Sequence, residues 1–420
     1  MSFVNKLGYG TGAKMAKKTE DSTSRLSRLD PTRINDSAEA FGESLRNKVI
    51  GQGKAVQAAL DVYNVYLAGL SPSGKPISNL LMLGPTGTGK TRLVEAVAET
   101  LYGDARAMIK VDCGEFQHSH EIAKLIGSPP GYLGHRETHP ILTQESLNQW
   151  HTDACRVSIV LFDEIEKASD ALWALLLGIL DKAVLTLGDN RRVDFSQAII
   201  FMTSNLGAAQ MASAVNGGMG FAAAAIDGGE SRRNVPSDAE IDKIAADAAK
   251  RKFTPEFVNR IDHTVVFHSL RSAELESILD LELMAIMDRL AKSRNSAGSV
   301  PLAIKLDDSA RKIILDDGYD PRYGARHLKR SLERHVVLPI GRMISSGQLK
   351  LVGETLEIKG EASELAYFVD REAMALLVND TVQHTLENSQ ILSNRQFPNS
   401  RTDNSKKSRT LQFPFNVKSY

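Results

Sequence analysis

Apolar runs of strand length alternate with helical patterns between about residue 45 and residue 267. Each run is continuous rather than alternating, which is typical of strands that are covered on both faces of a sheet. Such strands, separated by helices, predict a parallel sheet with helices on both faces, and hence an α/β fold. The five runs are residues 79–84 (NLLMLG), 107–112 (AMIKVD), 158–164 (SIVLFDE), 198–205 (AIIFMTSN) and 264–268 (TVVFH).

The pattern changes after residue 267, where long helical periodicity takes over. Residues 272–292 form one extended helical pattern, followed by a short strand-like run, two more helical patterns and a last strand at residues 355–360. We therefore predict a large nucleotide-binding-type domain over residues 45–267 and a small, mainly helical domain over residues 268–360.

The two ends of the chain lack this periodicity. Residues 1–44 mix Lys, Ser, Thr, Gly and Arg and predict a flexible basic arm, and residues 361–420 predict a largely flexible extension. Residues 208–234 are rich in Ala and Gly and predict a flexible loop inside the large domain.

Composition limits the functional classes. The chain carries 51 basic and 51 acidic side chains, and a net charge of zero argues against nucleic acid or an anionic membrane as the main partner. The longest apolar run, residues 171–180, is too short to span a bilayer, and the polar N-terminus does not resemble a signal peptide. The two cysteines are far apart, which excludes a disulfide framework. We expect a soluble protein of the reducing cytoplasm.

The sequence GPTGTGKT directly follows the first apolar run and precedes an amphipathic helix. It has the pattern of a phosphate-binding loop, in which glycines turn backbone N–H groups toward phosphate oxygens. Lys90 is then expected to reach the β- and γ-phosphates, and Thr91 to hold Mg²⁺. A simple glycine turn would need neither residue. The predicted nucleotide-binding residues of this loop are Gly84, Pro85, Thr86, Gly87, Thr88, Gly89, Lys90 and Thr91.

Polar residues end two other predicted strands. Ligands bind at the carboxyl ends of the strands in such sheets, so Asp163 and Glu164 are expected at the phosphates. We assign Asp163 to Mg²⁺ and Glu164 to the water that attacks the γ-phosphate, as general base or positioning group. Asn205 can hydrogen-bond that water or the γ-phosphate, although an Asn after a strand more often bonds the local backbone.

Seven sequence blocks extend this set of residues. They are VIGQ at 49–52, GPTGTGKT at 84–91, GSPPGYLG at 127–134, LFDEIEKA at 161–168, MTSNLG at 202–207, FTPEFVNRID at 253–262 and GYDPRYGARHLKR at 318–330. In order and spacing, the blocks resemble the Clp-type AAA+ ATPases, and specifically the second ATPase domain of the ClpA, ClpB and ClpC unfoldases. The resemblance covers about residues 45–360.

The resemblance implies roles for further residues. Val49 and Ile50 match the adenine pocket, Asn205 matches sensor 1, and Arg326 matches sensor 2 of the small domain. Arg260 matches the arginine finger that reaches into the neighbouring subunit's active site. ATP with Mg²⁺ and a homo-oligomeric ring, which we expect to be a hexamer, are therefore implied. Without the motifs, a solvated surface cation would be the simpler interpretation of either arginine.

Tyr132, in GYLG, matches the pore-loop aromatic that grips a translocating polypeptide, and residues 185–195 match the position of a second pore loop. The alternative for Tyr132 is an ordinary turn residue. The histidines around this loop lack the spacing of a metal site, so we interpret them as surface or packing residues. They are His118, His120, His135 and His139.

The chain departs from the family in two respects. Residues 1–44 are too short for the N-terminal domain, first ATPase ring or middle domain of the double-ring members, so we expect a single-ring version. Met219, Gly220 and Phe221 stand where protease-coupled relatives carry a tripeptide that docks into the ClpP peptidase. Because the first of them is Met and the surroundings are rich in Gly and Ala, peptidase docking is an open alternative.

Two hypotheses of different class follow. The main one is a single-ring, ATP-driven unfoldase or remodelling chaperone that threads polypeptide clients through a central pore. The alternative is an AAA+ switch that assembles or disassembles one specific complex without processive threading. Tyr132 distinguishes them, because only threading needs an aromatic grip on the client.

Overall fold

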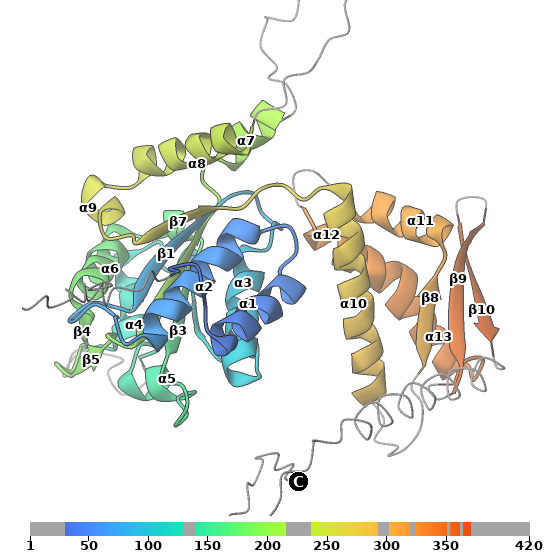
Figure 1. Ribbon diagram of the computed structural model, residues 1–420, viewed down its shortest axis with the longest axis horizontal. Helices are drawn as coiled ribbons and strands as arrows, with labels where there is room; N and C mark the ends of the chain where they lie inside the picture. Colours follow the sequence, from blue (N-terminus) through green and yellow to red (C-terminus); the bar gives the residue numbers. More distant parts are fainter. Residues whose placement is uncertain are drawn as a thin grey trace, which may run out of the picture.

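A computed structural model describes residues 30–128, 140–215, 237–292, 302–319, 324–350, 353–361 and 364–370 (Figure 1). The first part of the chain forms a layered domain around a central sheet. The long helix α10 (Ser272–Lys292) leads from it into a second body with a small sheet of its own.

A parallel sheet of five strands forms the centre of the large domain, in the order β2-β3-β6-β1-β7. All five predicted strands and the predicted α/β class are therefore confirmed. The phosphate-loop sequence follows β1, the two acids end β3, and Asn205 follows β6, so neighbouring strands bring these residues to one edge. The strands are β1 (Ser78–Leu83), β2 (Ile109–Asp112), β3 (Ser158–Asp163), β6 (Ala198–Ser204) and β7 (His263–Val266).

Helices cover both faces of this sheet (Figure 1). One face packs against α1 (Asp36–Lys48), α2 (Gly53–Leu67) and α3 (Lys90–Tyr102). The helices that pack on the other face are α4 (Ala123–Ile126), α5 (Gln144–Asn148), α6 (Asp170–Lys182), α7 (Ala208–Val215), α8 (Asp238–Lys252) and α9 (Pro255–Val258). An antiparallel hairpin of β4 (Val184–Thr186) and β5 (Arg192–Asp194) lies beyond α6, and short 3₁₀ turns occupy Cys113–Glu115, Ser119–Ile122 and Ile165–Lys167.

Strand β1 shows why the apolar runs are continuous. Leu80 and Met82 enter the hydrophobic cluster on the side of α1 to α3, whereas Leu81 and Leu83 enter the cluster on the opposite side. None of the four is more than 2% exposed. Because successive side chains of a strand point to opposite faces, burial on both faces requires an apolar residue at every position.

The small domain combines helices with a three-stranded sheet in the order β10-β9-β8, in which β8 and β9 are parallel and β9 and β10 antiparallel. Its apolar residues form a third cluster, which starts at Leu279. We propose residue 268 as the domain boundary, because the two clusters of the large domain end at Phe267. The elements after α10 are β8 (Ala303–Leu306), α11 (Asp308–Gly318), α12 (Arg326–Leu332), a π-helical turn (Glu333–Val337), α13 (Leu338–Ser345), β9 (Thr355–Glu361) and β10 (Glu364–Asp370).

The fold begins earlier than the predicted boundary at residue 45. Residues 36–48 form α1, whose N-cap Asn35 accepts a hydrogen bond from the Ala38 backbone at 2.7 Å. Phe41 is 4% exposed, and its ring lies 4.3 Å from that of Tyr63 on α2. The expectation of a flexible arm is therefore wrong for this part of residues 1–44, because widely spaced apolar residues form a buried stripe on the helix.

Two other expectations of flexibility also need correction. Residues 208–215 belong to helix α7, so only residues 216–234 of the predicted loop lie outside the described residues. Strand β10 adds residues 364–370 to the small domain, beyond the predicted end at residue 360. None of the described helices is both long and apolar enough to cross a bilayer.

We predict that Phe41→Ala lowers the free energy of unfolding by about 3 kcal/mol, because it leaves a cavity between α1 and α2. Glu43→Ala, on the exposed side of the same helix, should have little effect. Urea unfolding of both variants tests this. Equal stability of the two variants would mean that α1 does not contribute to the fold.

Candidate nucleotide site

The phosphate loop lies between β1 and α3. Gly84, Gly87 and Gly89 have φ values of 141°, 76° and 103°, a region that residues with a Cβ rarely adopt. A Cβ at Gly84 would stand 2.4 Å from the Phe267 carbonyl oxygen, so the backbone after β7 also requires glycine here. Thr88 is buried, and its hydroxyl donates to the Pro85 carbonyl at 2.9 Å, which closes the loop on itself.

Lys90 is the buried cation of this loop. Its ammonium donates to the carbonyl oxygens of Gly84 and Pro85 at 2.7 and 2.8 Å, and to Asn205 Oδ1 at 2.8 Å. Burial lowers the pKa of Lys90 to about 8, against the opposing effect of nearby carboxylates, and Arg326 lowers it further. Lys90 is therefore mostly protonated at neutral pH and suited to bind an anion. Thr91, the next residue of α3, is half-buried.

The two predicted acids lie at the carboxyl end of β3. Asp163 Oδ1 accepts from the Thr203 hydroxyl at 2.5 Å, and its Oδ2 pairs with the Lys110 ammonium at 2.9 Å. Glu164 has a φ of 55°, in the left-handed region that is costly for a residue with a Cβ. Its carboxylate pairs with the ammonium of Lys167. Strain of this kind is common where a side chain is held for function.

Asn205 connects the lysine to the acids. Its side-chain oxygen accepts from Lys90, and its amide nitrogen donates to Glu164 Oε1 at 3.4 Å. Its backbone N–H donates to Glu166 Oε1 at 3.1 Å, and Glu166 Oε2 is buried without a hydrogen-bond partner. The structure thus brings Lys90, Glu164 and Asn205 into one hydrogen-bonded cluster, as their positions after neighbouring strands predicted.

The segment that precedes α2 lies beside the loop. Val49 is buried and ends α1, and Ile50 is half-buried. Gln52, whose role the sequence did not suggest, is 4% exposed, and its amide donates to the Thr88 carbonyl at 3.1 Å. The adenine-pocket assignment of Val49 and Ile50 remains a prediction.

The small domain contacts the phosphate loop directly. The backbone N–H of Ala325 donates to the Gly87 carbonyl at 3.1 Å. Gly324 packs so closely on the loop that a Cβ there would stand 2.7 Å from the same oxygen. Arg326 follows at the start of α12 with an exposed side chain. Its charge lies close enough to lower the pKa of Lys90, so the structure brings Arg326 to the site.

Arg260 lies elsewhere. Its carbonyl accepts from the Asn79 side chain at 3.0 Å, near the start of β1, whereas the phosphate loop follows the end of that strand. Its guanidinium pairs with Glu256 at 3.2 Å and lies 3.5 Å from Asp181. The six residues of β1 span roughly 20 Å at about 3.3 Å per residue. Arg260 is therefore separate from the phosphate loop of its own chain.

The predicted pore-loop residue Tyr132 and the predicted docking residues fall on parts of the chain that the structure leaves undescribed. Tyr132, His135 and His139 lie in residues 129–139, and Met219, Gly220 and Phe221 lie in residues 216–236. The predicted second pore loop forms the β4–β5 hairpin. Its Gly188 N–H donates to the Ile126 carbonyl at 2.8 Å, which joins the hairpin to the chain just before residue 129.

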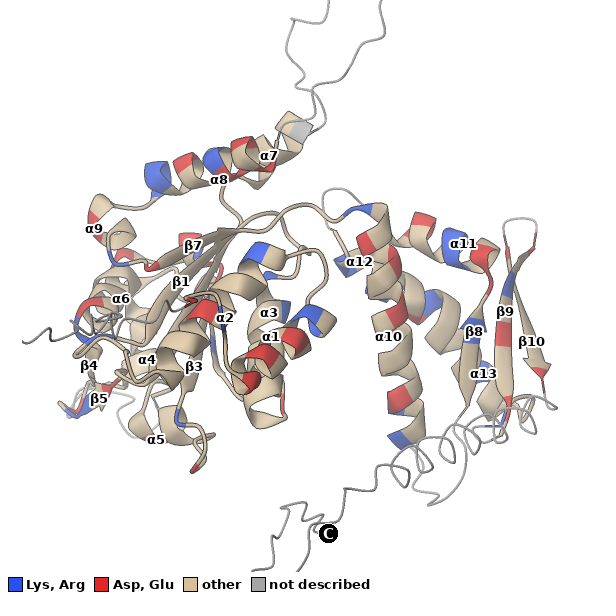
Figure 2. Ribbon diagram, viewed as in Figure 1, with Lys and Arg blue, Asp and Glu red and all other residues tan. Residues whose placement is uncertain are grey.

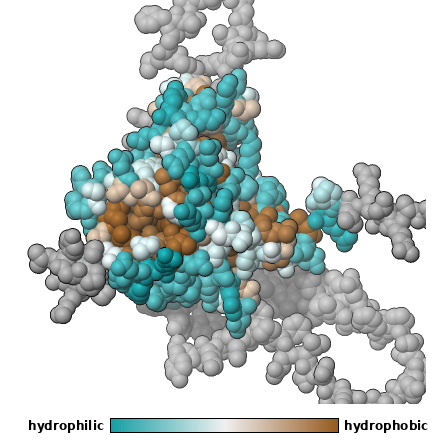
Figure 3. Space-filling view, turned by 90° about the vertical axis from the view of Figure 1, so that its left-hand side faces the viewer, coloured by the Kyte–Doolittle hydropathy of each residue, from teal (hydrophilic) through white to brown (hydrophobic). Residues whose placement is uncertain are grey.

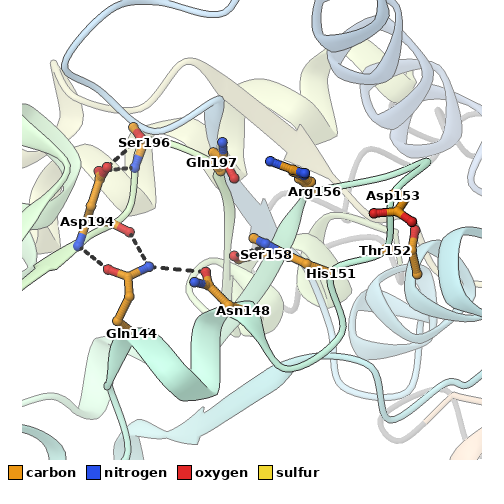
Figure 4. A pocket seen from close by; sticks show the side chains of 10 residues that line it. All are labelled: Gln144, Asn148, His151, Thr152, Asp153, Arg156, Ser158, Asp194, Ser196 and Gln197. Carbon is orange, nitrogen blue, oxygen red and sulfur yellow. Dashed lines mark hydrogen bonds between the residues drawn. The ribbon is translucent and has the colours of Figure 1, made fainter.

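A surface cavity of about 710 Å³ lies at the opposite end of the sheet, near the starts of β3 and β6 (Figure 4). Its His151 Nε2 lies 2.9 Å from Ser158 Oγ, a spacing that resembles a nucleophile with its base. However, the Ser158 hydroxyl donates to the Leu147 carbonyl at 3.0 Å, so its proton is already used by the backbone. His151 and Ser158 therefore support the fold rather than nucleophilic chemistry.

Sequence reasoning missed several residues of the nucleotide site. Thr203 and Glu166 lie within the quoted MTSNLG and LFDEIEKA blocks, so the blocks were the available signal for both. Lys167, which pairs with Glu164, also lies within the LFDEIEKA block, whereas Lys110, which pairs with Asp163, lies in none of the quoted blocks. Only the pairing of β2 with β3, which sets Asp112 beside Asp163, explains how Lys110 reaches its partner.

Comparison with known proteins finds a family match for each of the two domains. Residues 75–264 match the family model described as AAA domain (Cdc48 subfamily), and residues 270–358 match the C-terminal, D2-small domain of ClpB protein. The chain is 35% identical over 338 residues to the chaperone protein ClpB of Rhizobium meliloti, covering 80% of this chain and 34% of the relative.

Two further similarities point the same way. The ATP-binding subunit ClpC of the ATP-dependent Clp protease from Staphylococcus saprophyticus is 33% identical over 357 residues, covering 85% of this chain and 39% of the relative. A closed-state cryoEM reconstruction of Hsp104 with ATPγS and FITC casein superposes with a TM-score of 0.63 and 27% identity, covering 81% of this chain and 53% of that one.

The chain thus spans about a third of the length of the curated relatives that it matches, and its two domain matches follow one another in the order predicted from the motifs. With an AAA domain followed by a ClpB-type D2-small domain, it belongs to the Clp-type AAA+ ATPases.

Proposed function

We propose that this chain hydrolyses ATP within a homo-oligomeric ring, as a hexamer in the cytoplasm, and uses the cycle to thread polypeptides through a central pore. The observation that carries the proposal is the separation of Arg260 from the cluster of Lys90, Glu164 and Asn205. An ATP site that is assembled in one chain and completed by a cation from another requires neighbouring subunits.

The site residues suit ATP hydrolysis. Lys90 offers a buried ammonium to the phosphates, and Asn205, which accepts a hydrogen bond from Lys90, is the proposed group that orients the attacking water. Glu164, held by Lys167 and Asn205, is the proposed base for that water. Arg326 is the proposed contact from the small domain to the γ-phosphate.

Mg²⁺ would be held by the hydroxyl of Thr91 and the carboxylate of Asp163, and it would neutralise phosphate charge. A hydroxyl and a carboxylate beside a phosphate loop fit the preference of this ion for oxygen ligands. Lys110, which pairs with Asp163 at 2.9 Å, must then share or release that carboxylate.

The arginine finger is proposed to act in trans. Arg260 is 22% exposed and is oriented by Glu256 and Asp181, both of which lie on the large domain. Roughly 20 Å of strand separates it from its own loop. A guanidinium that cannot reach its own phosphates can still stabilise the charge that develops on a neighbour's.

An apolar surface supports contact between copies of the chain. Figure 3 shows hydrophobic side chains gathered on the face that carries α6 and β4 in Figure 1. On β4, Val184 is 40% exposed. A contiguous apolar area is unfavourable in water, which favours its burial against another subunit.

Threading is the finer part of the proposal. The relatives' names describe a chaperone and a protease ATP-binding subunit, and the Hsp104 structure contains casein. Tyr132 is the proposed grip on the client. The alternatives remain an AAA+ switch acting on one complex, and an ATPase subunit of a ClpP-like protease that docks through Met219, Gly220 and Phe221.

Charge gives little support to a nucleic-acid client. On the described helices α8 and α10, acidic and basic residues occur together rather than as a basic stripe (Figure 2). Electrostatic binding to phosphate backbones needs a concentrated positive surface.

We predict that Lys90→Ala abolishes ATP binding, whereas Glu164→Gln permits binding and blocks hydrolysis. The first change removes the cation that faces the phosphates, and the second removes only the base. Nucleotide affinity and turnover of both variants test the assignments. Wild-type turnover by Glu164→Gln would exclude Glu164 as the base.

We also predict that Arg260→Ala subunits are inactive alone but regain ATP turnover when mixed with Lys90→Ala subunits. In mixed rings, each Lys90→Ala subunit supplies an intact finger to a neighbour with an intact phosphate loop. Turnover is measured across mixing ratios, with mixing verified by differently tagged subunits. Mixed rings without any recovery would contradict the trans role.

Finally, Tyr132→Ala should leave basal ATP turnover within about threefold of wild type and eliminate unfolding of a folded client, because it removes the grip and no catalytic charge. The assay follows ATP turnover together with the fluorescence of a folded reporter that carries an accessible tail. If Tyr132→Ala unfolds the reporter as well as wild type does, the switch hypothesis becomes the better one.

A further inference from the structure

The side chain of Gln52 bridges two distant segments of backbone. Its Nε2 donates to the Thr88 carbonyl at 3.1 Å and to the His268 carbonyl at 3.0 Å. Its Oε1 accepts from the His268 N–H at 3.3 Å. With 4% of its surface exposed, Gln52 has both amide hydrogens and its oxygen engaged with main-chain atoms.

The two segments that Gln52 joins have different roles in the molecule. Thr88 belongs to the phosphate loop, and His268 lies in residues 267–271, which connect β7 to the first helix of the small domain. This connection also touches the start of the loop, because the Phe267 N–H donates to the Leu83 carbonyl at 2.7 Å. A single side chain therefore joins the end of the phosphate loop to the connection between the domains.

The surroundings hold this bridge in place. Gly51, with a φ of 77°, is so close to α10 that a Cβ there would stand 2.8 Å from the Glu274 carboxyl carbon. The imidazole Nε2 of His268 lies 3.0 Å from the Asp242 carboxylate, which also accepts from the Lys54 ammonium at 2.6 Å. The turn before α2, helix α8 and the connection thus converge at one point.

We propose that Gln52 is a positioning residue that carries movement of the phosphate loop to the connection between the domains, so that the bound nucleotide sets the orientation of the small domain. The inference rests on the proposed ATP cycle. It adds a route for the coupling that the Ala325 contact with the loop does not supply, since that contact bonds the Gly87 carbonyl and does not involve His268 or the connection between the domains.

The physical basis is the cost of breaking the bridge. An amide is planar and rigid, and a buried carbonyl or N–H left without a partner is unfavourable because it has lost its hydrogen bonds to water. When the Thr88 carbonyl moves, keeping all three hydrogen bonds requires His268 to move with it. The displacement is therefore transmitted to the connection rather than absorbed within the loop.

The test uses two substitutions at Gln52 and one control. Gln52→Met keeps the approximate length of the side chain and removes all three hydrogen bonds, and Gln52→Glu places carboxylate oxygens against two carbonyls. The matched control is Gln57→Glu, on the exposed face of α2, where the amide donates to the Asp61 carboxylate at 2.8 Å. Circular dichroism establishes that each variant is folded.

Spin labels on the full-length chain report the domain orientation. Lys75→Cys and Lys305→Cys place labels on exposed positions of the large and small domains. Cys155→Ser removes the half-buried native thiol, and Cys113 is buried. Labelled chain is diluted with an excess of unlabelled chain, and the distance between the labels is measured with ADP and with ATPγS, both with Mg²⁺.

We expect the wild-type distance to differ between the two nucleotides and both Gln52 variants to lose this difference. Their kcat should fall while nucleotide Kd stays within about threefold, because the phosphate contacts themselves remain. Gln57→Glu should behave like wild type. A purely structural role would lower stability and leave the nucleotide-dependent distance intact, and that result would overturn the proposal.

Two other outcomes are also decisive. A wild-type chain that hydrolyses ATP without any change in distance would overturn the coupling and leave the proposed function standing, whereas a chain that neither binds nor hydrolyses ATP would remove both. If the Gln52 variants do not fold, hydrogen exchange of wild-type peptides containing His268 decides the matter. Exchange that is equal with ADP and with ATPγS would contradict the proposal.

Discussion

A buried lysine ammonium is the constraint around which the site is organised. Lys90 has lost most of its water, so the folded chain must surround it with oxygen atoms. Two of them come from the loop after β1, and the third comes from Asn205 after β6, which in turn contacts Glu164 at the end of β3. The oxygen atoms that surround this one cation therefore come from the ends of two neighbouring strands, and Asn205 extends the cluster to a third.

The parts of the structure that followed from sequence are those governed by local pattern. Strands that are buried on both faces appear in the sequence as continuous apolar runs. Because the strands of the sheet are parallel, the residues that follow them are expected to lie close together. Helix α1 was missed because its apolar residues Ala38, Phe41 and Leu45 are isolated in a polar stretch. Strand β10 has no fully buried residue, so a core-based pattern does not reveal it, and its pairing with β9 places it in the sheet.

The side chains that the sequence did not predict, Gln52 and Lys110, were missed for a different reason. Gln52 bonds backbone atoms 36 and 216 residues away, and a backbone carbonyl carries no residue type that a sequence pattern can reveal. Lys110 reaches Asp163 only through the pairing of β2 with β3. Sequence therefore predicts which residues cluster beside the loop after β1 better than it predicts which residues hold that cluster in position.

The alternation of side chains along β1 has a consequence for the tolerance of the fold to insertions and deletions. Leu80 and Met82 belong to one core, and Leu81 and Leu83 to the other. Successive side chains of a strand point to opposite faces of the sheet. Adding or removing one residue within β1 would therefore turn each later side chain of the strand to the opposite face, and so into the other core. The same change would displace the phosphate loop from Asn205. The length of this strand is thus fixed by packing and by chemistry together, and variation in chain length among relatives of this protein should concentrate elsewhere.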